Sequence, residues 1–218
     1  MEQSKITNFF KVSSNKPKFN YYVYTDGACS NNGGKMAKAG IGIYFSENDP
    51  RNVSERVIGK QTNNTAELSA IINTFPIIKN DVENGLRICI VSDSQYSIRC
   101  ATTYGQKQAD IKWSKDIPNK NLVKEIYTLY KKKNIEFMHI KAHTGKLDTH
   151  SMGNDGADRL ANKAIGVEQC PYNKVYLTVP YENKEHCKSL GGKWDRVTKQ
   201  WYVFSNNVHI KSLQEKYT

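Results

Sequence analysis

Residues 21–92 carry five runs of distinct periodicity: YYVYT (21–25), GIGIYF (40–45), NVSERVIG (52–59), TNNTAELSAIINTF (62–75) and LRICIVS (86–92). The first three are short, rich in strand-forming residues and bounded by Gly, Asn or Pro, which predicts an antiparallel meander of three strands. The fourth has helical spacing, with Ala66, Ala70 and Phe75 on one side after the capping-type residues Thr62 and Asn63. The fifth has a continuously apolar centre, which predicts a strand buried on both faces.

Downstream of residue 92 the chain alternates helical and strand patterns. Helical patterns occupy SQYSIRCATTYG (94–105), NLVKEIYTLYKKK (121–133) and NDGADRLANKAIG (154–166), and a strand pattern occupies IEFMHIK (135–141). Three hairpin strands followed by helix, strand, two helices, strand and helix predict an α/β fold. We expect a five-stranded mixed sheet flanked by helices.

The two ends of the chain differ from this central region. Residues 1–19 are polar and rich in Lys, Ser and Asn, which predicts a flexible tail. Residues 20–168 are expected to form the main domain. Residues 172–218 contain YLTVP, ENKEHCKSLG and KWDRVTKQWYVF, which predict a strand, a helix and a hairpin, and so a small accessory α+β module.

Composition narrows the class of protein. The chain has 218 residues and a net charge of +11, which favours a polyanionic partner such as nucleic acid over a small acidic metabolite. Its five cysteines form no CxxC pair, which disfavours a disulfide framework or a structural zinc site. No run approaches the roughly 18 apolar residues of a membrane span, and the first residues lack the apolar core of a secretory signal. We therefore expect a soluble, intracellular and monomeric protein without a membrane partner.

Four carboxylates occupy positions where this fold would gather them. Asp26 and Asp93 end the predicted first and fourth strands, whereas Glu67 and Asp158 lie on the first and last helices. Ligands of open α/β sheets bind outside such strand ends. Acids crowded together repel one another unless cations neutralise them, and hard oxygen ligands suit Mg²⁺ or Mn²⁺. Two such ions can activate a water and stabilise a departing oxygen, so the pattern indicates phosphodiester hydrolysis.

The sequence around these acids resembles the ribonuclease H type 1 family over about residues 20–166. Five motifs in the family's order carry the resemblance: TDGACSNN (25–32), QTNNTAEL (61–68), VSDSQY (91–96), IKAHTG (140–145) and GNDGADRLAN (153–162). It implies a ribonuclease H-like fold and an endoribonuclease that cuts the RNA strand of RNA–DNA hybrids, leaving 5′-phosphate and 3′-hydroxyl ends. It also assigns two Mg²⁺ ions, for which Mn²⁺ could substitute, to Asp26, Glu67, Asp93 and Asp158.

The same resemblance implies that His143 assists proton transfer or product departure. Fifteen positions separate His143 from Asp158, a longer loop than is usual in the family, and His150 in this loop is a rival for the role. Of the neighbouring acids, Asp155 is expected to cap the last helix, with the metal site as its alternative place, and Asp148 is expected to be solvated.

Hybrid recognition in this family reads RNA through its 2′-hydroxyl groups and holds DNA through its phosphates. A 2′-hydroxyl both donates and accepts, and short amides can match both roles. The resemblance implies that the minor groove is lined by Cys29, Asn32, Asn63, Asn64 and Gln95. It implies that the DNA strand is held by Lys60, Thr62 and Asn121, with Tyr96 and Tyr104 along its channel. For the two tyrosines, core packing is the alternative, and residues 107–120 stand where the family has a basic protrusion, here diluted by acids.

The amino-terminal tail contains Gln3, Ile6, Phe9 and Phe10 in the pattern QxxIxxFF. This pattern resembles the peptide with which replication enzymes dock on a PCNA-like sliding clamp. On one helical turn the three apolar side chains would fill a pocket of the partner. The alternative is that the two phenylalanines pack on the protein's own core.

Residues 175–205 resemble a small module of the DUF5710 type, and this resemblance implies no particular function. Lys193, Arg196 and Lys199 are expected to contact nucleic acid. Trp194 and Trp201 are expected to form the core of the module, and the alternative is that they stack on bases together with Tyr202.

The sequence thus predicts an RNA–DNA hybrid endonuclease that removes primers or persistent hybrids during DNA replication. We expect it at sites of replication, in a nucleus, a cytoplasm or a viral factory depending on the source. One alternative is a DNA-cutting resolvase or transposase of the same fold, which would have no use for residues that read a 2′-hydroxyl. Another is a non-enzymatic hybrid-binding or clamp-tethering factor, which would not need four intact carboxylates.

Overall fold

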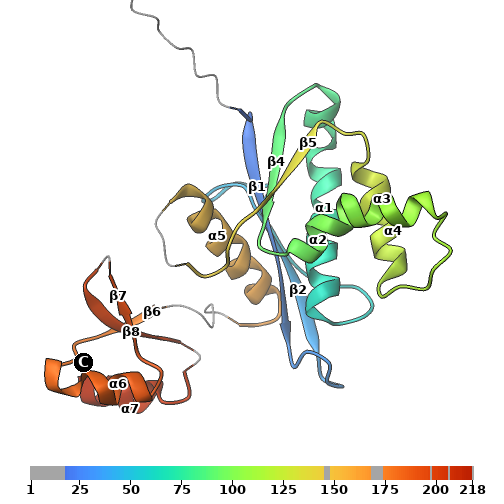
Figure 1. Cartoon of the computed structure of the whole chain (residues 1–218). Coiled ribbons are helices and arrows are strands. Elements are labelled where there is room, and N and C mark those ends of the chain that lie inside the picture. The colour runs from blue at the N-terminus through green and yellow to red at the C-terminus, as the bar shows by residue number, and fades with distance from the viewer. Residues whose placement is uncertain (1–17, 145–147, 168–173, 197, 206, 218) are drawn as a thin grey trace, which may run out of the picture.

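The computed structural model describes residues 18–144, 148–167 and 174–217, apart from 197 and 206. Its larger sheet has five strands in the order β3-β2-β1-β4-β5 (Figure 1). Their bounds are β1 (Tyr21–Ser30), β2 (Lys38–Tyr44), β3 (Val53–Arg56), β4 (Ile88–Ser92) and β5 (Ile135–His139). The first three pair antiparallel, and β4 runs parallel to both β1 and β5. The predicted meander and mixed sheet are therefore confirmed.

Helices cover both faces of this sheet (Figure 1). They are α1 (Asn63–Glu83), α2 (Gln95–Ala101), α3 (Thr103–Asp110), α4 (Lys120–Tyr130) and α5 (Thr149–Ala164). The main core packs Val23, Ile43 and Ile90 of the sheet against Leu68 of α1 and Ile126 of α4, all fully buried. On the opposite face, α5 contributes Ala157 to a smaller core. No helix in the described ranges is both long and apolar enough to cross a membrane.

Two glycines let the layers approach closely. A Cβ at Gly42 of β2 would lie 1.9 Å from the carbonyl oxygen of Ala157, so α5 lies directly on the sheet there. A Cβ at Gly27 of β1 would lie 2.3 Å from the backbone nitrogen of Glu67 on α1. Real Cβ atoms do not tolerate such distances, so any larger side chain would push the helices away from the strands.

Three helix boundaries differ from the sequence predictions. The first helix does not end at Phe75 but continues through Pro76 to Glu83, because Ile78 beyond the proline is fully buried in the core. Residues 94–105 form two helices rather than one, with the break at Thr102, whose φ of −123° and ψ of −108° are not helical. The last helix begins at Thr149 rather than near Asn154.

The roles predicted for two acids are exchanged. Asp148 was expected to be solvated, but it is the N-cap of α5, where its Oδ1 accepts hydrogen bonds from the backbone nitrogens of His150 and Ser151. Asp155 was expected to cap the helix but lies within its second turn. The reason is that an aspartate at an N-cap satisfies backbone donors that otherwise lack partners, so the helix starts at the earlier acid.

A second, three-stranded sheet follows residue 173, with the order β6-β8-β7. Its elements are β6 (Lys174–Leu177), η1 (Tyr181–Asn183), α6 (Lys184–Ser189), β7 (Lys193–Asp195), β8 (Gln200–Phe204) and α7 (Ile210–Tyr217). The sequence analysis did not predict α7, although its Leu213 and Tyr217 are buried in this small core. Trp201 is buried as expected, but Trp194 was wrongly expected in the core and is 49% exposed. It lies on the short edge strand β7, where its ring makes a T-shaped contact with Trp201 at 5.6 Å between the ring centroids.

Candidate active site

Strand register brings Asp26 and Asp93 together. The last parallel pair between β1 and β4 is Thr25 with Ser92, so each acid is the next residue after the same rung. The sequence analysis expected the first strand to end at Asp26. Instead β1 continues to Ser30, because it remains paired with β2 after its pairing with β4 has stopped.

Glu67 reaches the same place from α1. The helix begins after Thr62, whose side chain and backbone form a reciprocal capping box with Thr65. Glu67 therefore lies in the second turn, where the close approach of Gly27 brings α1 onto β1. The Gly27 nitrogen also donates a hydrogen bond of 2.7 Å to Oδ1 of Asp26 and so fixes that carboxylate.

Asp158 comes from α5, which presents a row of polar side chains at intervals of four residues. Asn162 donates from Nδ2 to Oδ1 of Asp158 at 2.8 Å. Asn154 donates from Nδ2 to Oδ2 of Asp93 at 3.2 Å. All three α5 side chains are buried, so this row orients two of the four carboxylates.

These carboxylates form one buried acidic pocket. Asp26, Glu67 and Asp93 each offer a ligand oxygen, and these atoms lie within 4.8 Å of one another. The pocket has a volume of about 380 Å³, and Asp158 and His143 also line it. The four acids predicted as metal ligands therefore lie around one cavity.

Burial and mutual repulsion dominate the electrostatics of the pocket. Burial raises the pKa of Asp26 well above its usual value, and the charges of Glu67, Asp93 and Asp158 raise it further. The pKa of Glu67 is raised by burial and by Asp93. The pKa of Asp93 is raised by burial, against the hydrogen bond from Asn154, which lowers it. Removal of an ionised carboxylate from water disfavours its charged form unless an opposite charge is nearby.

A divalent cation fits this donor set. Oε2 of Glu67 is buried and has no hydrogen-bond donor among the described residues. Three carboxylates that offer oxygens within reach of one another, one of them with an oxygen that lacks a donor, are a site of the type that hard cations bind. A bound cation would offset the repulsion among the carboxylates of the acidic pocket.

The structure separates the two histidines that the sequence left as rivals. His143 lines the acidic pocket, and its charge lowers the pKa of Asp93. His150 points elsewhere, since its Nδ1 lies 3.2 Å from the Tyr24 hydroxyl and its ring packs edge-on against Tyr22. Of the two, only His143 is placed to act on a substrate held by the carboxylates.

Several predicted hybrid-binding residues surround the pocket. Cys29 and Asn63 line it together with the acids. Asn32 lies next to them, and its Oδ1 accepts a hydrogen bond from the Asn63 nitrogen. Thr62 is the N-cap of α1, and the Lys60 carbonyl accepts a hydrogen bond from the Thr65 hydroxyl in the same turn.

The remaining predicted contacts lie on α1, α2, α3 and α4. Asn64 and Gln95 are exposed near the starts of α1 and α2. Tyr96 and Tyr104 both pack against the main core, as the alternative reading expected, while remaining partly accessible. Asn121 is exposed on α4, where it lines a separate hollow with Lys124 and Thr128.

Sequence reasoning missed the residues that hold the acids in place. Asn154 and Asn162 lie four residues before and after Asp158, and this spacing on a predicted helix would have placed them on the same face. His139 was also missed. Its Nε2 lies 3.1 Å from the carbonyl oxygen of Asp93, a contact that follows from the strand register rather than from any sequence pattern.

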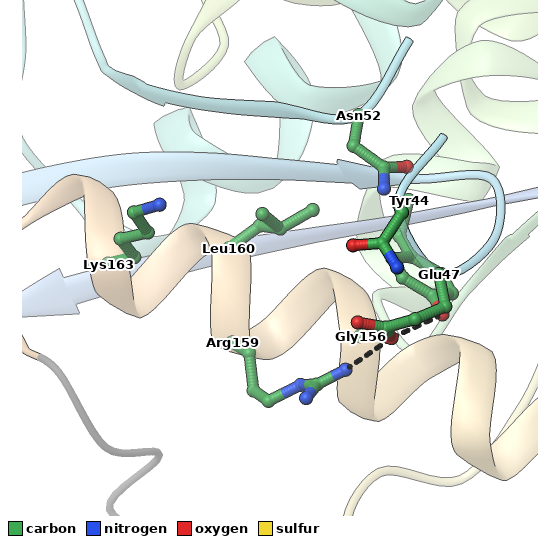
Figure 2. A pocket seen from close by; sticks show the side chains of 8 residues that line it. Tyr44, Glu47, Asn52, Gly156, Arg159, Leu160 and Lys163 are labelled. Atoms are coloured by element: carbon green, nitrogen blue, oxygen red, sulfur yellow. Dashed lines mark hydrogen bonds and ion pairs between the residues drawn. The ribbon is translucent and has the colours of Figure 1, made fainter. Parts of the chain in front are cut away.

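A second cleft lies between α5 and the loop that follows β2. It has a volume of about 490 Å³ and is lined by residues that include Tyr44, Asn52 and Lys163. Figure 2 shows Arg159 reaching toward Glu47, with which it forms an ion pair of 3.5 Å. Glu47 is the only acid among the described residues that line this cleft, so it lacks the carboxylate cluster of the acidic pocket.

Comparison with known proteins agrees with this geometry. Residues 18–166 match the family model described as RNase H, and residues 174–214 match a domain of unknown function, DUF5710. Ribonuclease H1 of Mus musculus is 37% identical over 145 residues, which cover 65% of this chain and 48% of that protein. Ribonuclease H of Francisella philomiragia is 34% identical over 155 residues, which cover 68% of this chain and 92% of that protein. The chain thus spans about half the length of the mammalian relatives it matches.

A solved structure supports the fold. The solution structure of the PFV RNase H domain superposes with a TM-score of 0.53 at 22% identity, and covers 68% of this chain and 96% of that one. This likeness concerns the arrangement of the elements and confirms the predicted fold class.

The raised carboxyl pKa values predict how stability depends on pH. An acid whose pKa is higher in the folded state contributes most below its unfolded pKa of about 4, and its contribution is lost as pH rises through the raised value. Without divalent cations, Asp26→Asn should therefore be as stable as the wild type near pH 4 and increasingly more stable toward pH 7. The measurement is the free energy of unfolding from urea titrations in EDTA across this range. If the wild type became more stable relative to the variant as pH rises, the carboxylates would not be repelling one another. Addition of Mg²⁺ should reduce the difference in free energy of unfolding between the variant and the wild type.

Proposed function

The chain belongs to the RNase H family, and on that premise we propose that it is an endoribonuclease that hydrolyses the RNA strand of RNA–DNA hybrids. The observation that carries the proposal is the acidic pocket, in which three carboxylates offer oxygens within 4.8 Å of one another. A structural neighbour, the foamy viral protease-reverse transcriptase, has been solved in complex with an RNA/DNA hybrid. We extend that substrate class to this chain.

Asp26, Glu67, Asp93 and Asp158 would hold two Mg²⁺ ions. When bound, such ions would lower the pKa of a water and stabilise the charge that develops on the departing oxygen. Asn154 and Asn162 orient their acids through hydrogen bonds from α5, which keeps the oxygens converging on one point. His143, at the rim of the pocket, would carry a proton toward the leaving oxygen or help the product depart.

Recognition of the RNA strand would use the polar residues that adjoin the acids. Cys29 and Asn63 line the pocket, and Asn32 is hydrogen-bonded to Asn63, so these groups are positioned as one unit beside the cleavage site. Short side chains of this kind can donate to and accept from a 2′-hydroxyl, which DNA lacks. This arrangement favours an RNA-cutting enzyme over a DNA-cutting relative of the same fold.

The amino-terminal motif would bring the enzyme to its substrate. Gln3, Ile6, Phe9 and Phe10 lie outside the described residues, so the proposal of docking on a PCNA-like sliding clamp rests on their pattern in the sequence. Tethering to a clamp raises the local enzyme concentration at replicating DNA without changing the chemical step. The role that follows is removal of primers and persistent hybrids during replication.

Cleavage of an end-labelled RNA–DNA hybrid tests the activity directly. With Mg²⁺ the wild type should cut the RNA strand of the hybrid but neither duplex DNA nor duplex RNA, and EDTA should stop the reaction. Asp93→Asn should lower turnover at least about a hundredfold, because a metal ligand set supplies several kcal/mol of transition-state stabilisation. Hybrid binding by the variant, measured by fluorescence anisotropy, should persist. Turnover by Asp93→Asn near that of the wild type would refute the assignment of this pocket as the catalytic site.

The two loop histidines offer a matched comparison. His143→Ala should lower kcat by about a hundredfold, at the low end of the range for a positioned proton-transfer group, and leave KM nearly unchanged. His150→Ala removes an imidazole from the same part of the chain but outside the pocket, so its kcat should stay near that of the wild type. A larger loss in His150→Ala than in His143→Ala would reverse the assignment.

The clamp motif is tested separately from catalysis. Substitution of Phe9 and Phe10 by Ala should eliminate binding to the cognate sliding clamp in a pull-down with purified proteins. Cleavage of short hybrids should be unaffected, since the motif lies outside the catalytic domain. If the double variant binds the clamp as well as the wild type does, the motif is not the docking peptide.

A further inference from the structure

The three-stranded sheet formed by β6, β7 and β8 has two faces of different character. One face carries Leu177, Trp201 and Val203, which pack against Cys187 of α6 and Leu213 of α7 to form the small core. Side chains alternate along a strand, so the residues between these point to the other face. Neither α6 nor α7 covers that second face. It carries the rings of Tyr176, Tyr202 and Phe204, and we call it the aromatic face.

The aromatic face is built around Tyr202 of the central strand β8. Register places Tyr176 of β6 opposite it on one side and Lys193 of β7 opposite it on the other. The ring centroid of Tyr202 lies 6.1 Å from that of Tyr176 and 5.6 Å from that of Phe204. Tyr176 is 39% exposed, so the row of rings is accessible from outside the sheet.

Cations lie among these rings. The Lys193 ammonium lies 4.5 Å from the ring centroid of Phe204, and that of Lys174 lies 4.7 Å from the ring centroid of Tyr202. Asp195, the one acid on this face among the residues that the structure describes, is buried, and it accepts hydrogen bonds from Lys174 and the Tyr176 hydroxyl at 2.6 and 2.9 Å. Asp195 therefore fixes two members of the face without exposing a negative charge.

The charge of the module is unevenly distributed between its two sides. Lys174 and Lys193 lie on the strand side, and Arg196 and Lys199 are exposed in the connection between β7 and β8. The other three acids of residues 174–217 lie on the helical side, at Glu182, Glu185 and Glu215. The strand side is consequently the more cationic, which suits a polyanion rather than an acidic metabolite or a neutral peptide.

We propose that the aromatic face binds single-stranded nucleic acid. Its rings would stack on unpaired bases while Lys193, opposite Tyr202, contacts a phosphate, as in other proteins that combine stacking aromatics with a basic surface. A duplex or hybrid keeps its bases stacked on one another and cannot offer them to the rings. The ligand is therefore a single strand, and the inference does not depend on the activity proposed above.

The test is binding of a fluorescein-labelled oligo(dT) to the full chain, followed by anisotropy in EDTA so that no cleavage intervenes. Tyr176→Ala and Tyr202→Ala should each weaken binding about fivefold or more, the expected loss of one base stack. Tyr176→Phe keeps the ring and should bind nearly as the wild type does. Tyr181→Ala is the matched control. Tyr181 is 78% exposed, and the Lys184 ammonium lies 3.8 Å from its ring centroid, but it lies on the helical side.

The phosphate contacts have their own signature. Lys193→Gln should reduce the slope of log K against log salt by about 0.7, the value for one phosphate contact with a single strand. Circular dichroism of each variant establishes that the module remains folded, and Lys193→Gln, at an exposed position, keeps the proposal testable if Tyr202→Ala does not fold.

Equal affinity of the wild type, Tyr176→Ala and Lys193→Gln for oligo(dT) would overturn the proposal. So would an equal loss in Tyr181→Ala, which would indicate a diffuse effect of surface aromatics. A change of oligomeric state in Tyr176→Ala with unchanged oligo(dT) binding would identify the aromatic face as a protein interface instead.

Discussion

Asp26 and Glu67 are buried and Asp93 is half-buried, with their oxygens within 4.8 Å of one another, and their negative charges repel. Left to themselves, such groups would separate or take up protons. The fold prevents separation. The shared rung of β1 and β4 fixes two of the acids, and the contact of Gly27 with α1 fixes the third. The pocket is therefore an arrangement of negative charge that the rest of the core holds together, and a divalent cation is the partner that would relieve it.

The helix on the opposite face completes this arrangement. Gly42 lets α5 lie directly on the sheet, and Asp148 fixes where that helix begins. Together they fix where on the sheet α5 places Asp158 and the asparagines four residues to either side of it. His143 lines the pocket although fifteen positions separate it from Asp158, which α5 brings there.

Much of this could be predicted from the sequence, and the exceptions have physical causes. Periodicity and turn residues predicted the meander and the helices, and the family motifs predicted which acids would meet. Periodicity could not predict that α1 passes through Pro76, because the burial of Ile78 outweighs the local cost of a proline. Two acids could each have capped α5, and only the packed helix selects Asp148. Trp194 seemed a core residue by composition, but its place on an edge strand leaves half of it exposed.

The central claim is that the acidic pocket binds divalent cations because its carboxylates are buried and mutually repelling. Isothermal titration of Mg²⁺ into the full chain, at about one pH unit above the ordinary carboxyl pKa of about 4, tests it most directly. Titration in two buffers of different ionisation enthalpy reports the protons released. The account predicts saturable binding with net proton release, reduced in Asp26→Asn, because the cation displaces protons that the raised pKa values retain. Absence of saturable binding, or binding without proton release, would contradict it.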